Sequence, residues 1–177
     1  MQIGLRQNKL AIPLIYGIDA VHGNNNLYGA TIFPHNIGLG AANDPELMYE
    51  IGRVTAREML VTGINYNFSP AFSVAQNISW GRTYESFSEN PEIHVNLAQQ
   101  AILGYEENGV SATAKHFLGD GGTVGGNDQG NVVATEEEIR ELFLAAYYEA
   151  IEAEVDSIMI SYSSINGLKM HGSEYWI

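Results

Sequence analysis

The hydrophobic pattern of this chain alternates short apolar runs with longer stretches at helical spacing. Buried strands are predicted at residues 14–18, 64–68, 110–117 and 157–161. Helices are predicted at residues 44–63, 90–109 and 135–150. Asp44 and Asn90 each precede a proline, and Thr135 with Glu138 forms a capping box, so each helix has a defined start. This alternation of strands and helices is typical of βαβ units in a parallel sheet.

Four parallel strands with three helices make half of an eightfold barrel, and a full (β/α)8 barrel needs about 250 residues. The pattern predicts an α/β fold, and one interpretation of it is a partial TIM-like barrel, with residues 1–177 as a single partial domain. A small doubly wound sheet is the alternative, and it would be complete at 177 residues. A strand signal within the first twenty residues and the bulky ending Tyr175-Trp176-Ile177 predict that the domain is truncated at both ends.

Polar side chains follow the predicted strands, where α/β folds build their sites. Asp19 comes after the first strand and either accepts hydrogen bonds from a ligand or caps a local turn. Arg82 lies among aromatic and acidic residues after the second strand and either binds a ligand or orders its loop by pairing with a glutamate. Tyr162, after the fourth strand, places a hydroxyl over a pocket or sits on its rim.

Lys115 and His116, at the end of the third strand, form the strongest local signal. Lysine is rarely buried unless it is paired, so a Lys-His pair on an apolar strand needs acceptors nearby. Neighbours on a regular strand face opposite sides of the sheet. For both to share a pocket with Asp19 and Arg82, we predict a bulge or a non-proline cis peptide bond near residues 114–118.

Composition and charge exclude several classes of function. The chain has 21 acidic and 8 basic residues, a net charge of −13, which argues against nucleic acid as a partner. No apolar stretch approaches the roughly 20 residues of a membrane span, so no membrane partner is predicted. Cysteine is absent, and the sequence contains no G-x-G-x-x-G, P-loop or H-E-x-x-H motif, so no cofactor and no metal are predicted. The remaining charged and aromatic residues suit a neutral, hydroxyl-rich ligand such as a sugar.

Five ordered motifs resemble glycoside hydrolase family 3, in its β-glucosidase and glucan exohydrolase branch. They are Y-G-I-D-A-V-H-G, A-T-I-F-P-H-N-I-G-L-G, W-G-R-T-Y-E-S-F-S-E, A-K-H-F-L-G-D-G-G-T and M-I-S-Y-S-S-I-N-G. The resemblance covers nearly the whole chain. It implies an N-terminal (β/α)8-like barrel whose pocket is shared with a second α/β domain, and a retaining hydrolysis of terminal β-D-glucosyl residues from β-glucosides or β-glucan oligosaccharides. It also suggests a periplasmic or secreted location.

The same resemblance implies roles for single residues, carried over motif by motif. The implied substrate-binding residues are Asp19, Arg82, Lys115, His116, Met159 and Tyr162. Asp19 would bind hydroxyls of the terminal glucosyl unit, and Arg82 would line the same subsite. Lys115 and His116 would grip the sugar hydroxyls. Met159 would line the pocket, with Tyr162 beside the nucleophile.

The two catalytic carboxylates of the family are not among these motifs. The nucleophile is an aspartate in an S-D-W-like motif, which does not occur in this sequence, and the acid/base glutamate belongs to the second domain. We assign neither role to Glu85, Asp120 or Asp128, and we expect the isolated chain to be inactive. Two alternatives stay open: a non-catalytic carbohydrate-binding protein, and an N-acetylhexosaminidase of the same family. That branch carries a K-H-F-P-G-H-G-like loop with a catalytic histidine where this chain has Asp120.

Overall fold

A computed structural model describes residues 9–177, so the first eight residues of the predicted domain lie outside it. Its four parallel strands are β1 (Gly17–Ile18), β2 (Tyr66–Asn67), β3 (Thr113–Phe117) and β5 (Ser157–Ile160). β1 pairs with β2 and β3 pairs with β5. Isolated parallel bridges join Tyr66 of β2 to Ser111, before β3, and Ala71, after β2, to Lys115 of β3. The strands therefore follow one another in chain order, and their carboxyl ends lie on the same side.

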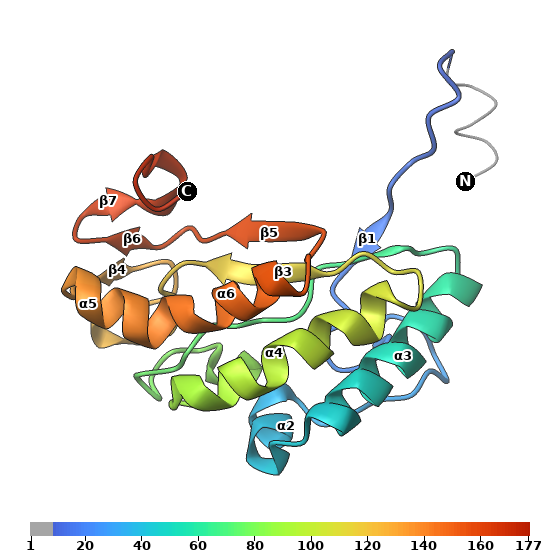
Figure 1. The fold of residues 1–177 in the computed structure, drawn as a ribbon, viewed down its shortest axis with the longest axis horizontal. Coiled ribbons are helices and arrows are strands. Elements are labelled where there is room, and N and C mark those ends of the chain that lie inside the picture. The colour runs from blue at the N-terminus through green and yellow to red at the C-terminus, as the bar shows by residue number, and fades with distance from the viewer. Residues whose placement is uncertain (1–8) are drawn as a thin grey trace.

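Helices cover one side of these strands. They are α2 (Asn36–Ala42), α3 (Pro45–Val61), α4 (Pro91–Glu106), α5 (Glu136–Ile139) and α6 (Ala145–Glu152), with a π-helical turn (Arg140–Leu144) joining the last two. Figure 1 shows α3, α4 and α6 side by side along one side of the strands. A doubly wound sheet has both faces covered, so this arrangement favours the partial barrel.

The predicted helix starts are confirmed in detail. The Asp44 side chain accepts from the backbone N–H of Leu47, and the Asn90 side chain accepts from that of Glu92. Thr135 and Glu138 form the reciprocal capping box. Each cap satisfies backbone N–H groups that have no partner inside the helix.

Glycines let the helices approach closely. A Cβ on Gly104 of α4 would come within 2.5 Å of the Tyr49 carbonyl oxygen of α3, and a Cβ on Gly52 would lie 2.9 Å from Gly104. The hydrophobic core lies between this helical layer and the strands, with Leu97, Ile102 and Tyr147 fully or almost fully buried. The carboxyl ends of β3 and β5 are therefore supported by a tightly packed core.

A second small sheet lies beyond these carboxyl ends and was not predicted. It consists of β4 (Asn131–Val132), β6 (Ser164–Ile165) and β7 (Leu168–Lys169). β4 and β6 run parallel, and β6 turns back into β7 as an antiparallel hairpin through Asn166 and Gly167, which both have positive φ. Figure 1 places this sheet next to the arrowheads of β3 and β5.

The first predicted strand is mostly wrong. Only Gly17–Ile18 is strand, and Leu14, Ile15 and Tyr16 are 62%, 76% and 62% exposed. Within residues 9–177, no element covers these three side chains, so their apolar character did not lead to burial. Short 3-10 turns complete the fold at Thr83–Glu85, Val124–Gly126 and Met170–Gly172. No helix in the described part of the chain is long and apolar enough to cross a membrane.

Candidate functional site

The carboxyl end of β3 has the irregular backbone that the sequence predicted. The peptide bonds Lys115–His116 and Phe117–Leu118 are both cis. Lys115 and Phe117 pair with consecutive residues of β5, so His116 is skipped in the register. In a regular strand, adjacent side chains point to opposite faces of the sheet. Because the register skips His116, the side chains of Lys115 and His116 do not have to follow this alternation.

Lys115 and Asp19 form an ion pair between β3 and the segment after β1. Lys115 Nζ donates to Asp19 Oδ1 at 2.7 Å. The lysine side chain is 3% exposed and the aspartate side chain 62% exposed. The buried ammonium therefore holds a surface carboxylate in place and leaves the second carboxylate oxygen open to a ligand.

Arg82 is bound by Glu85 in a bidentate pair. Arg82 Nε donates to Glu85 Oε1 at 2.8 Å, and Nη2 donates to Oε2 at 2.7 Å. This pairing raises the pKa of Arg82. It is the loop-ordering pair that the sequence left open, because Glu85 closes the 3-10 turn that follows Arg82. The same guanidinium also reaches His116, whose Nε2 lies 3.3 Å from Nη2.

Glu85 lies between the Arg82–His116 contact and the Lys115–Asp19 ion pair electrostatically. Burial acts to raise the pKa of its carboxyl, but the hydrogen bonds and charge of Arg82 outweigh burial, and the charge of Lys115 acts in the same direction as Arg82. The net pKa of Glu85 is lowered. Glu85 is thus ionised between cations from the β2 loop and from β3.

Asp120, in the glycine-rich loop after β3, completes this network. Its Oδ1 accepts from the hydroxyls of Ser161 and of Ser163, the latter at 3.0 Å. Its Oδ2 lies 2.8 Å from His116 Nδ1. Burial alone would raise the pKa of Asp120, but His116 and the two hydroxyls together lower it.

Four of the six predicted residues line one cavity of about 520 Å³: Arg82, His116, Met159 and Tyr162. Asp19 and Lys115 are not in its lining. The structure therefore places the predicted residues in two adjoining groups, linked through Glu85, rather than in a single pocket. Whether they bind substrate stays a prediction.

Sequence reasoning missed further residues of this cavity. Asp128 lines it and accepts from Trp80 Nε1 at 3.2 Å. His171 also lines it and stacks on Tyr162, with ring centroids 4.9 Å apart and an interplanar angle of 30°. The position of Asp128 in a glycine-rich loop after a strand could have indicated it. His171 follows the unpredicted hairpin, so no pattern pointed to it.

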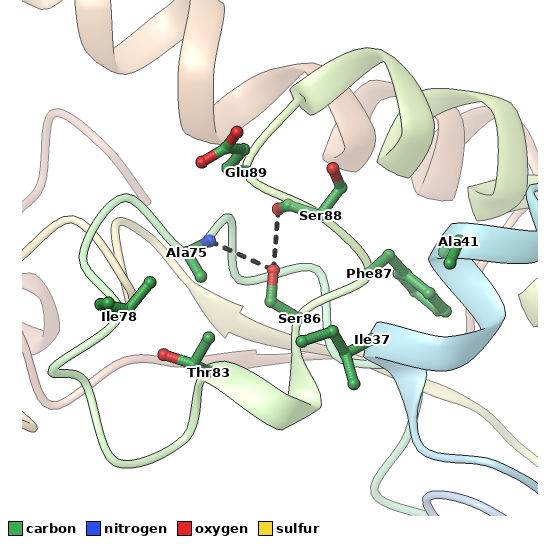
Figure 2. Close-up of a pocket in the computed structure, with 10 residues that line it drawn as sticks. Ile37, Ala41, Ala75, Ile78, Thr83, Ser86, Phe87, Ser88 and Glu89 are labelled. Carbon is green, nitrogen blue, oxygen red and sulfur yellow. Dashed lines mark hydrogen bonds between the residues drawn. The ribbon is translucent and has the colours of Figure 1, made fainter.

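A second cavity, of about 310 Å³, lies between α2 and the loop before α4 (Figure 2). At its centre the Ser86 hydroxyl donates to the Ser88 carbonyl oxygen at 2.9 Å and accepts from the Ala75 N–H at 3.1 Å. Ser86 thus binds its own loop, and no predicted site residue lines this cavity. The candidate site is therefore the first cavity. In residues 9–177, no group of three or more His, Cys, Asp or Glu side chains is placed to hold a metal ion.

Comparison with known families decides the relationship. The model of the glycosyl hydrolase family 3 N-terminal domain matches residues 1–177. The chain belongs to this family. The partial α/β TIM-like barrel is therefore the fold of a family 3 N-terminal domain, as the sequence predicted.

Individual proteins that are similar to this family 3 chain support the same assignment. It is 34% identical over 174 residues to the lysosomal β-glucosidase of Dictyostelium discoideum, covering 92% of this chain and 21% of that protein. It matches the crystal structure of an exo-1,3/1,4-β-glucanase from a Pseudoalteromonas species with 44% identity and a TM-score of 0.91, over 93% of this chain and 22% of that one.

A third relative is the β-glucosidase of Listeria innocua, solved as a mutant in complex with laminaribiose. It matches with 27% identity and a TM-score of 0.92, over 99% of this chain and 25% of that one. The family 3 chain thus spans between a fifth and a quarter of the length of the relatives it matches.

Proposed function

We propose that this chain is the part of a β-glucosidase or β-glucan exohydrolase that binds the terminal, non-reducing β-D-glucosyl unit. The observation that carries the proposal is the joining of Arg82, His116, Met159 and Tyr162 around one cavity at the carboxyl ends of the strands. In barrel enzymes, sites lie at this end of the strands. The relatives named as β-glucosidases and glucanases support the same substrate class.

The available polar groups fit sugar hydroxyls. Within the described residues, Arg82 Nη1 makes no hydrogen bond and can donate, and Asp19 Oδ2 can accept. Tyr162 is 66% exposed, and its side chain lines the cavity together with His171, on which it stacks. Hydroxyls that both donate and accept, on a ring with apolar C–H faces, would use all of these groups.

The complete enzyme would hydrolyse its substrate with retention, through two carboxylates and a glycosyl-enzyme intermediate. The family's S-D-W-like nucleophile motif is not in this sequence, and both oxygens of Asp120 are already engaged. The residues of this chain would therefore position the sugar, a role through which binding energy lowers the barrier. We expect no turnover of an aryl β-glucoside by the isolated chain. Turnover above a buffer blank that Asp19→Ala abolishes would contradict this expectation.

The binding proposal is tested by titrating the chain with laminaribiose and following amide shifts by NMR. Arg82→Met should abolish the shifts around His116 and Tyr162. Arg53→Met is the matched control, because Arg53 forms an ion pair of the same i,i+3 type with Glu50 on the surface of α3. Equal binding by both variants, or equal shifts with the α-linked disaccharide maltose, would refute the proposed site. N-acetylglucosamine is the arm that tests the hexosaminidase alternative.

A further inference from the structure

Asp120 is a buried acid for which the proposed sugar contacts give no role. Its side chain is 9% exposed, and it lines the cavity beside His116. The hydroxyls of Ser161 and Ser163, from the segment after β5, hold one carboxylate oxygen. The other oxygen faces the His116 ring. Such a carboxylate is tied to β3 and to the β5 segment at once, and it is not free to exchange a proton with a ligand.

The two ring nitrogens of His116 face groups of opposite charge. Nδ1 lies 2.8 Å from Asp120 Oδ2, and Nε2 lies 3.3 Å from Arg82 Nη2. A lone pair on Nδ1 would be repelled by the carboxylate. An N–H on Nε2 would be repelled by the guanidinium, which can only donate. Of the two neutral tautomers, only the one with its proton on Nδ1 suits both neighbours.

We propose that Asp120 is a positioning residue, which holds His116 as the Nδ1–H tautomer so that the Nε2 lone pair accepts from Arg82 Nη2 and fixes the guanidinium at the cavity. The guanidinium held in this way leaves Nη1, which makes no hydrogen bond within the described residues, to donate to a sugar hydroxyl. The expected effect of this tautomer on sugar binding rests on the proposed function. The tautomer itself does not depend on sugar, so the two can fail separately.

The first experiment reads the tautomer directly in the sugar-free chain. Long-range proton–nitrogen NMR spectra of the histidine rings at alkaline pH should show His116 protonated on Nδ1. Asp120→Asn, which removes the charge and keeps the shape, should shift His116 toward a mixture with the Nε2–H form. Asp128→Asn is the matched control: it neutralises a carboxylate of the same cavity that contacts Trp80 rather than His116, and it should leave the His116 pattern unchanged.

Two results would overturn the proposal at this stage. One is a wild-type His116 ring protonated on Nε2. The other is an unchanged pattern in a folded Asp120→Asn chain. If Asp120→Asn does not fold, Ser163→Ala provides the test, because it loosens the carboxylate by removing one hydroxyl and should shift the tautomers in the same direction by less.

The second experiment connects the tautomer to binding. Asp120→Asn should weaken laminaribiose binding about ten-fold, because a His116 ring that is no longer held in one tautomer by the adjacent carboxylate orients Arg82 less well. Glu106→Gln is the control and should leave the affinity unchanged, because Glu106 accepts from the backbone N–H groups of Ala112 and Asp156 at the amino ends of β3 and β5, away from the cavity. If the wild type binds no sugar, the proposed function fails while the tautomer result still stands. If the tautomer changes and the affinity does not, the positioning role is wrong and the sugar site survives.

Discussion

Strands β3 and β5 are joined at each end by one carboxylate, and the two ends use it differently. At the amino ends, Glu106 Oε1 accepts from the backbone N–H groups of Ala112 and Asp156, at 3.3 and 2.8 Å. At the carboxyl ends, Asp120 meets only side chains, two serine hydroxyls and an imidazole. Any residue provides the backbone N–H groups that bind Glu106. The partners of Asp120 are particular side chains, and these can line a cavity.

The pKa values of the two acids are shifted in opposite directions, which matches the difference between their partners. Burial raises the pKa of Glu106, and its two backbone hydrogen bonds only partly offset this effect. The pKa of Asp120 is lowered, because His116 and the hydroxyls outweigh burial. Folding therefore disfavours the charge of Glu106 and favours that of Asp120. Glu106 therefore supports the sheet without needing its charge, whereas the contribution of Asp120 depends on its carboxylate being ionised.

The largest effect is expected from Asp120→Ala. Two hydroxyls, on serines that are each 1% exposed, and the His116 ring would lose their acceptor. Removing one partner from such a buried charged cluster should lower the unfolding free energy by about 3 kcal/mol. Urea denaturation monitored by circular dichroism measures the loss. A loss no greater than that of Glu106→Ala would erase the proposed difference between the two ends.

Glu106→Ala should cost less, about 2 kcal/mol in the same measurement. Ala112 is completely buried, so its N–H would be left without a partner, whereas Asp156 is exposed and water can replace the carboxylate there. We expect the His116 tautomer to be the same as in the wild type. A changed tautomer would show that the two ends of the strands are coupled.

Local signals predicted most of the fold. The starts of α3, α4 and α5 were predictable because each cap is made by residues a few positions apart, such as Asp44 with Leu47. α2 was missed because His35 provides no side-chain cap and no acidic residue stands in the first turn. The strands β4, β6 and β7 have two residues each, too few for a periodic pattern.

The site was predictable in its residue types but not in its grouping. Lys115 stood out because a lysine on an apolar strand needs a partner, and Asp19 is that partner. The division into two groups depends on where the irregular end of β3 directs His116, which is a property of the tertiary structure. The role of Asp120 depends on Ser161 and Ser163, about forty residues away in the sequence, and no local pattern connects them.

Asp120→Asn should show a pH dependence that distinguishes charge from shape. The lowered pKa means that the ionised form stabilises the folded state above the unfolded pKa of about 3.9. The wild type should therefore exceed the variant by about 1 kcal/mol at neutral pH, and the gap should close as the pH falls below about 4 toward the lowered pKa. Unfolding curves at several pH values test this. A gap that stays constant would assign the effect to packing.

Glu106→Gln should give the smallest effect and the opposite pH trend. The amide oxygen can still accept from Ala112 and Asp156, so the backbone contacts survive. Because the pKa of Glu106 is raised, folding favours its protonated form, whose stabilising contribution is fully present below about pH 4.3 and is lost as the pH rises through the folded-state pKa. At neutral pH the variant should thus be as stable as the wild type or slightly more so, by less than about 1 kcal/mol, since the carboxylate is partly solvated. On acidification the wild type should gain relative to the variant, where in the Asp120→Asn comparison it loses. Paired urea titrations of the two variants across this pH range provide the measurement, and trends of the same sign in both would mean that the two carboxylates do not differ in the way described.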